Sequence, residues 1–163
     1  MRNCVDGYRL DNMDATRSWS FVSDALADAR TVRLAVRRFL ETSADTETSD
    51  LDGAELIVGE LIANVVRHGS PPFGVCVDWH SEVPTLYVSD RGRPQKRLLY
   101  SAPDHEAEYG RGLLLVRALS RGSLAIEARE GTRCGTRVVV TLPVRRKSRG
   151  VERGPMLARR PAR

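Results

Sequence analysis

Three polar side chains that could hold a metal ion or move a proton recur at intervals of four residues. They are Glu60, Asn64 and His68, and on a helix this spacing places them along one edge, bordering the apolar stripe. A neutral amide oxygen such as that of Asn64 suits a hydrated Mg²⁺ ion, and a carboxylate such as Glu60 can take a proton from a hydroxyl. The same spacing is also compatible with the solvated edge of an amphipathic helix.

A second candidate for chemistry lies where an apolar run ends in an acid. Leu86–Ser89 is followed by Asp90, then by Gly92 and Pro94. A carboxylate at the end of a buried strand can accept a hydrogen bond from the exocyclic amine of adenine. Guanine presents a carbonyl at that position, so the carboxylate would select ATP over GTP. An ordinary Asp-Gly turn fits the residues equally well.

A third candidate is the run Gly110-Arg111-Gly112-Leu113, which opens an apolar segment. Glycines at a helix start leave backbone N–H groups facing outward, where the helix dipole favours an anion, and Arg111 adds a charged donor for phosphate oxygens. A dinucleotide-binding fingerprint would need glycine at Leu115, and the chain has no P-loop motif. Near the end of the apolar pattern, Thr136 offers a hydroxyl that could support a purine contact.

The elements that must position these residues follow from hydrophobic periodicity and from glycine and proline breaks. Asp50 is the expected N-cap of the helix that carries Glu60 and Asn64, and Gly69 is its expected stop. A mixture of this kind predicts an α+β fold, a two-layer sandwich with helices on one face of a mostly antiparallel, mixed sheet. The expected helices are 25–40, 51–67 and 112–119, the expected strands are 18–22, 73–79, 85–89, 124–128 and 137–142, and 91–109 is an expected loop.

Length and charge set the expected domain organisation. A chain of 163 residues with 41% hydrophobic residues fits one globular domain. The net charge of +5 is uneven, because residues 144–163 carry +7 and the remainder −2. We therefore expect an N-terminal extension over 1–17, one domain over 18–143 and a basic, disordered tail over 144–163.

Several classes of function are disfavoured by composition. The absence of a long apolar run and of a secretory signal predicts a cytoplasmic protein that does not bind membranes. Three scattered cysteines and the unpatterned histidines disfavour disulfides and a zinc site. The basic tail could contact a polyanion weakly, but no aromatic residues are interleaved for stacking on nucleic acid.

Taken in order, the motifs resemble the nucleotide site of the GHKL superfamily of gyrase, heat-shock chaperone, histidine-kinase and mismatch-repair ATPases. Glu60-x-x-x-Asn64 resembles the N-box, Asp90-x-Gly92 the G1 box, Gly110-x-Gly112 the G2 box and Gly135-Thr136 the closing G3 element. The amino-acid sequence of residues 54–69 is most similar to the anti-sigma-factor serine kinases, particularly their stand-alone actinomycete versions.

The resemblance implies a Bergerat-type ATP-binding fold, with Asp90 on adenine, Asn64 on Mg²⁺ and Glu60 as the base that activates a partner's serine. Residues 95–109 would be the lid, although they lack the glycine-rich opening of larger members. Glu108 stands near the place where better-studied kinases of the group often carry arginine.

The implied function is an ATP-dependent serine/threonine kinase that phosphorylates a small anti-anti-sigma-type domain, binds a sigma factor, or does both, and that could form a homodimer. The alternative is a nucleotide-sensing partner-switching module without significant catalysis. Both use the same ATP site, but only the kinase requires Glu60 as a base.

Overall fold

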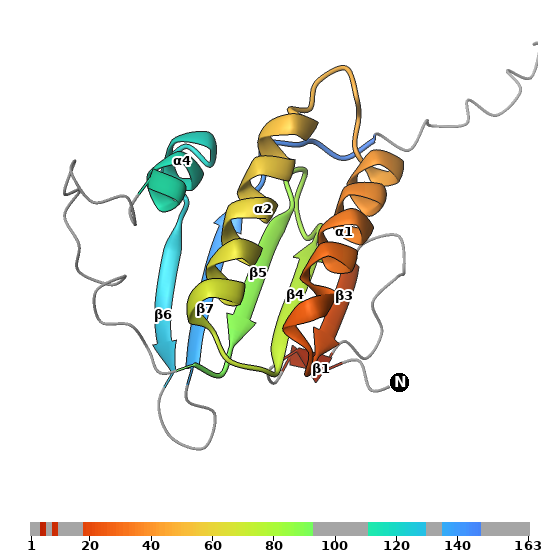
Figure 1. Cartoon of the computed structure of the whole chain (residues 1–163). Helices are drawn as coiled ribbons and strands as arrows, with labels where there is room; N and C mark the ends of the chain where they lie inside the picture. Colours follow the sequence, from red (N-terminus) through yellow and green to blue (C-terminus); the bar gives the residue numbers. More distant parts are fainter. Residues whose placement is uncertain (1–3, 6–7, 10–17, 93–110, 130–134, 148–163) are drawn as a thin grey trace, which may run out of the picture.

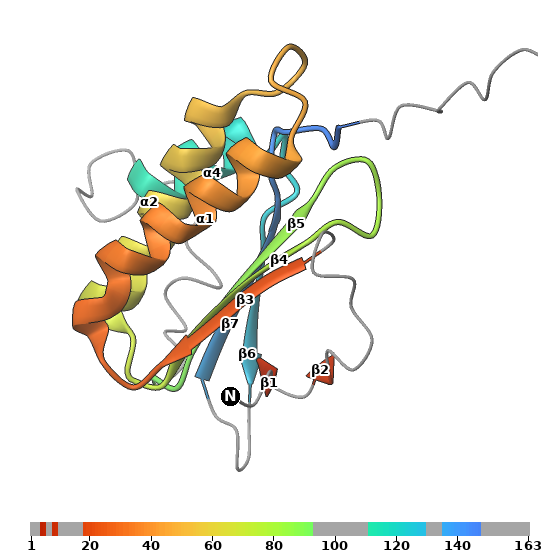
Figure 2. The same cartoon turned by 90° about the vertical axis from the view of Figure 1, so that its right-hand side faces the viewer.

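The computed structural model describes residues 4–5, 8–9, 18–92, 111–129 and 135–147. A five-stranded open sheet forms one layer, and the three α-helices lie together on one of its faces (Figures 1 and 2). The sheet and its helices are β3 Ser18–Ser23, the 3₁₀ turn η1 Leu26–Asp28, α1 Ala29–Ser43, α2 Leu51–His68, β4 Phe73–Asp78, β5 Thr85–Asp90, α4 Arg111–Leu119, β6 Ala125–Arg129 and β7 Gly135–Thr141. The predicted α+β sandwich is confirmed.

The strand order is β3-β4-β5-β7-β6, and all four of these pairings are antiparallel. The expected mixed sheet is therefore fully antiparallel over the described residues. A separate two-stranded ladder, β1 Cys4–Val5 with β2 Tyr8–Arg9, lies on the side of the sheet away from the helices, with β1 near β3 and β4 (Figure 2).

The core lies between the two layers and follows the two expected periodicities. Strand residues alternate, so that one face of each central strand packs against the helices. The buried helix positions recur at intervals of three and four. The fully buried side chains include Val32, Val36, Ile57, Val58 and Leu61 from the helices and Val75, Val77, Leu86, Val88 and Val140 from the strands.

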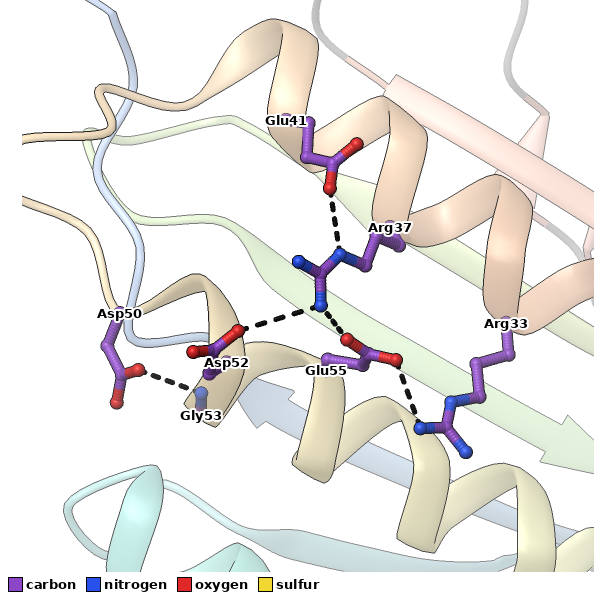
Figure 3. Close-up of polar contacts among 7 residues, drawn as sticks. All are labelled: Arg33, Arg37, Glu41, Asp50, Asp52, Gly53 and Glu55. Carbon is purple, nitrogen blue, oxygen red and sulfur yellow. Dashed lines mark hydrogen bonds and ion pairs between the residues drawn. The ribbon is translucent and has the colours of Figure 1, made fainter.

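Helix α2 begins where its sequence predicts. The Asp50 side chain accepts a hydrogen bond from the Gly53 backbone N–H at 2.8 Å, which satisfies one of the free donors of the first turn (Figure 3). Gly69 follows the last helical residue, as expected. Helix α1 differs from its prediction, because its first turn is 3₁₀ and its last residue is Ser43 rather than Leu40.

Residues 144–147 follow the predicted domain end at residue 143 and contact the rest of the domain. Val144 is fully buried, and the Lys147 backbone N–H donates to the Ser43 carbonyl. The Lys147 ammonium also donates to the carbonyls of Glu41 and Thr42 at the end of α1. Residues 144–147 therefore pack against the domain, and the disordered tail expected over 144–163 stays a prediction for the residues beyond them. Residues 148–163 and the extension 1–17, apart from β1 and β2, lie outside the described residues.

Within the described part of the chain, no helix is both long enough and apolar enough to cross a bilayer.

Candidate functional site

The row of polar side chains on α2 lies where helical spacing predicts. Glu60, Asn64 and His68 are each half-buried, between the core-facing stripe and the solvent-facing side of α2. The stripe itself, which includes Leu61 and Val65, is buried against the sheet. A buried apolar stripe therefore holds the row in a fixed direction relative to the sheet.

Asp90 is the last residue of β5, and its carboxylate is held by the backbone. Its Oδ1 accepts hydrogen bonds from the Gly92 N–H at 2.6 Å and from the Ser70 N–H at 3.4 Å. Its Oδ2 has no hydrogen-bond partner among the described residues. Burial raises the pKa of Asp90 above its ordinary value, and the two backbone donors oppose that rise. One oxygen is thus fixed by the protein, and the other remains available to a ligand.

Glycines surround Asp90 because side chains would collide with it. A Cβ at Gly92 would lie 2.6 Å from Asp90 Oδ1, and one at Gly69 would lie 3.0 Å from Asp90 Cγ. A Cβ at Gly135 would overlap the Asp90 backbone carbonyl, and Gly135 also has a φ of +156°. The backbone can approach the Asp90 carboxylate at Gly69 and Gly92, and the Asp90 carbonyl at Gly135, only because these positions lack side chains.

A cavity joins these elements. It holds about 450 Å³ of empty space, part of it open to solvent. Asn64 and His68 from α2, Asp90 from β5, Leu113 from α4 and Thr136 from β7 all line it. The remaining lining residues are Leu61, Val65, Gly69, Val88, Ile126 and Val138. The cavity therefore combines an apolar wall with a few polar groups, which is the usual composition of a small-molecule site.

Thr136 reaches the cavity because of strand register. It lies opposite Asp90 in the β5–β7 ladder, and both side chains point to the helix-covered face. Ile126 pairs with Val138 in the β6–β7 ladder on the same face. Sequence reasoning did not include Ile126 and Val138 in the site, although the alternation Thr136, Val138, Val140 already indicated a shared face.

Glu60 contacts the start of α4 instead of lining the cavity. A Cβ on Gly112 would overlap the Glu60 carboxylate, so that carboxylate rests directly against the first turn of α4. Arg111 is exposed and does not line the cavity, and Gly112 is half-buried beside Glu60. The structure thus brings a candidate base to a helix N-terminus that can face an anion.

Most of the candidate residues therefore converge on one place. Asn64, His68, Asp90, Leu113 and Thr136 share the cavity, and Gly92, Gly112 and Glu60 adjoin it. Pro94 and Gly110, together with the predicted lid 95–109, lie outside the described residues. Sequence reasoning assigned Gly69 only the role of a helix stop and missed both its contact with Asp90 and the Ser70 N–H donor.

Comparison with known families identifies the domain that contains the cavity. The family model of the histidine kinase-like ATPase domain matches residues 22–142. The chain belongs to this family. Among solved structures, the histidine kinase AdeS of Acinetobacter baumannii is similar, with 15% sequence identity, a TM-score of 0.43 and coverage of 80% of this chain and 68% of that one. No curated protein matches the chain.

As a histidine kinase-like ATPase domain, the protein is an ATP-binding regulatory domain, and its cavity fits that ligand chemically. The apolar walls suit a purine ring, and Asp90 Oδ2, which no described residue bonds, suits a ring substituent that donates a hydrogen bond. Within the described residues no three His, Cys, Asp or Glu side chains cluster as a metal site. The Asn64 side-chain oxygen at the cavity is of a ligand type that Mg²⁺ accepts.

Proposed function

We propose that this protein is an ATP-dependent serine/threonine kinase of the anti-sigma-factor type, acting in the cytoplasm on a small anti-anti-sigma-type domain and binding that domain, a sigma factor or both. The contact between the Glu60 carboxylate and the start of α4 carries the proposal. It places a group able to accept a proton beside the helix end best suited to hold phosphates.

The base-binding half of the proposal rests on Asp90. Its Oδ2 would accept a hydrogen bond from the adenine amine, while Thr136, opposite it in the sheet, would support the same edge of the ring. Gly69 and Gly92 would allow the purine edge to approach the backbone closely. Guanine would place a carbonyl against the carboxylate, so ATP should be strongly preferred to GTP.

The phosphate half of the proposal rests on α2 and α4. Asn64 would supply one oxygen to Mg²⁺, whose charge would stabilise the phosphate oxygens, and the N–H groups at Gly112 and Leu113 would face the phosphates. His68 lines the same cavity one turn after Asn64. Arg111 is exposed at the first position of α4 and could supply a cation from the rim, together with Gly110 and Pro94 outside the described residues.

In the proposed transfer, Glu60 accepts the proton of a serine hydroxyl on the partner. The serine oxygen forms a bond to the γ-phosphorus as the bond between that phosphorus and the bridging oxygen breaks, which leaves ADP and a phosphoserine. Catalysis would depend mainly on positioning and electrostatics, as in other phosphoryl transfers.

The ATP site is tested by thermal unfolding with Mg-ATP and with Mg-GTP. ATP at a hundred times its Kd should stabilise the protein by about 2.7 kcal/mol, and GTP should have little effect. Asp90→Asn is the matched variant, because its Oδ1 can still accept both backbone hydrogen bonds while an NH₂ group replaces Oδ2. Equal stabilisation of the variant by ATP would contradict the assignment of Asp90.

The kinase is tested by transfer of labelled γ-phosphate to anti-anti-sigma-type domains from the same genome. Glu60→Gln should retain ATP binding and lower the transfer rate by about 10²- to 10⁴-fold. If the wild-type protein binds ATP but transfers nothing, the nucleotide-sensing module without catalysis is the better description. That module needs the cavity alone, since Glu60 lies outside its lining.

A homodimer remains a proposal drawn from the family resemblance. Sedimentation velocity with and without Mg-ATP measures it directly.

A further inference from the structure

Helix α2 has a second groove on the side that faces α1, away from the nucleotide cavity. It holds about 240 Å³ of empty space, part of it open to solvent. Its floor is apolar and its rim is charged. The floor is Val36, Leu40, Leu51 and Val58, and the rim is Arg33, Arg37 and Glu55. None of these residues lines the nucleotide cavity.

The rim is held by ion pairs between side chains that are exposed or half-buried (Figure 3). Arg37 contacts Glu55, and it lies 2.8 Å from Glu41 and 3.6 Å from Asp52. Arg33 lies 3.0 Å from the other oxygen of Glu55. Exposed pairs of this kind contribute little to stability. They can therefore exchange partners without unfolding the domain.

Two leucines extend the apolar surface beyond the groove. Leu34 follows Arg33 on α1 and is 51% exposed, and Leu56 follows Glu55 on α2 and is 47% exposed. Each thus stands on the outer side of its helix, next to a rim residue. The helix layer that carries them forms the outer face of the domain in Figure 1. Leu34 and Leu56 therefore leave apolar surface that the described residues do not cover.

Two arginines flank Leu34 and have no ion-pair partner among the described residues. Arg30 and Arg38 are exposed, and they lie one turn before and one turn after Leu34 on α1. They are eight positions apart on the helix, which is about 12 Å along the axis. The outer edge of α1 therefore presents Arg30, Leu34 and Arg38 in a row along the helix.

We propose that this face, formed by the outer edges of α1 and α2 and the groove between them, docks an acidic amphipathic helix of a partner protein. The partner's apolar residues would cover Leu34 and Leu56, and carboxylates about two turns apart would pair with Arg30 and Arg38. A nucleic-acid strand fits less well, because it would leave the exposed Leu34 and Leu56 side chains uncovered. The site is separate from the ATP cavity and does not require phosphotransfer.

The test uses a fluorescent helical peptide of about five turns, with leucines along one face and glutamates flanking them. Fluorescence anisotropy should show saturable binding to the full chain that weakens with added salt. A peptide with every glutamate replaced by glutamine should bind at least about tenfold more weakly. The double variant Leu34→Glu with Leu56→Glu should lower affinity by a similar factor.

The matched control is Val22→Glu. Val22 on β3 is 48% exposed, nearly as much as the two leucines, but it lies outside the helix layer. Peptide affinity should not change in this variant. Stabilisation by Mg-ATP should be the same in all variants, so a failure of this proposal is distinguishable from a failure of the ATP assignment.

Three results would overturn the proposal. The first is no measurable binding of the acidic peptide, or equal binding of its glutamine version. The second is displacement of the peptide by an oligonucleotide at equal charge concentration, which would assign the face to nucleic acid. The third is a wild-type dimer that Leu34→Glu with Leu56→Glu converts to a monomer in sedimentation velocity, which would assign the face to a second copy of this chain.

Discussion

The two sides of α2 hold charge in different ways. On the side of the cavity, Asp90 is partly buried and is fixed by the backbone N–H groups of Gly92 and Ser70. On the side of α1, Arg37 and Glu55 are half-buried and are held by each other and by the side chains of Glu41 and Arg33. A carboxylate fixed by backbone keeps its direction whether or not a ligand is bound. A pair of flexible side chains can rearrange to suit a partner. The first arrangement suits a small ligand of defined shape, and the second suits a protein surface.

Among substitutions near the cavity, we expect Gly135→Ala to destabilise the protein most. The new methyl group would overlap the Asp90 carbonyl, and the backbone at this position has a positive φ. Both effects strain the β5–β7 ladder, so we expect a loss of roughly 3 kcal/mol in the free energy of unfolding. Urea denaturation measures the loss. Gly122→Ala, at a positive φ with open space around it, is the control and should cost less. Equal losses would show that the contact with Asp90 is unimportant.

A subtler change to the same side is Asp90→Asn, followed as a function of pH in the absence of ATP. Because burial raises the folded pKa above the ordinary 3.8, the folded state binds this proton more tightly than the unfolded chain does. The carboxyl therefore favours folding below its ordinary pKa and progressively opposes it as the pH rises through the folded value.

The amide cannot ionise, so the variant should gain stability relative to wild type as the pH rises from about 3 to 7. Thermal unfolding across this range measures the difference. A variant that loses stability relative to wild type over the same range would show that the backbone donors outweigh burial.

A change that affects both sides equally is Asp50→Ala. It removes the N-cap of α2 and leaves the Gly53 N–H without its partner. The expected loss of stability is about 1 kcal/mol, with little change in ATP affinity because the cap is remote from the cavity lining. Asp50→Asn is the control, since an amide oxygen caps nearly as well. A large loss of ATP affinity would indicate that loss of the cap at the N-terminus of α2 displaces Asn64 further along the helix.

We expect the smallest change in stability for Arg37→Met, on the side of α2 that faces α1. The variant removes the contacts to Glu41, Asp52 and Glu55 and keeps an unbranched side chain of similar length. The melting temperature should be unchanged within experimental error, at both low and high salt. A clear drop at low salt that disappears at high salt would show that the rim is a stabilising network, and the contrast between the two sides of α2 would weaken.

Local patterns were sufficient for much of this protein. The spacing of Glu60, Asn64 and His68 predicted a shared edge of one helix, because a helix of 3.6 residues per turn leaves no other arrangement. Asp50 predicted the start of that helix for an equally local reason, its hydrogen bond to Gly53. The end of β5 at Asp90 followed from the break in its apolar run.

Contacts between distant segments were decided only by the tertiary structure. Ile126 and Val138 line the cavity because of strand pairing, and Gly69 contacts Asp90 although β4 and most of β5 lie between them in the chain. Local periodicity contains neither relation. The charge of its neighbours assigned Val144 to the tail, but its side chain is fully buried in the structure. The sequence alone thus determined which side chains share an element, since that depends on neighbours along the chain. The tertiary structure decided which elements meet, because packing depends on the direction of every element at once.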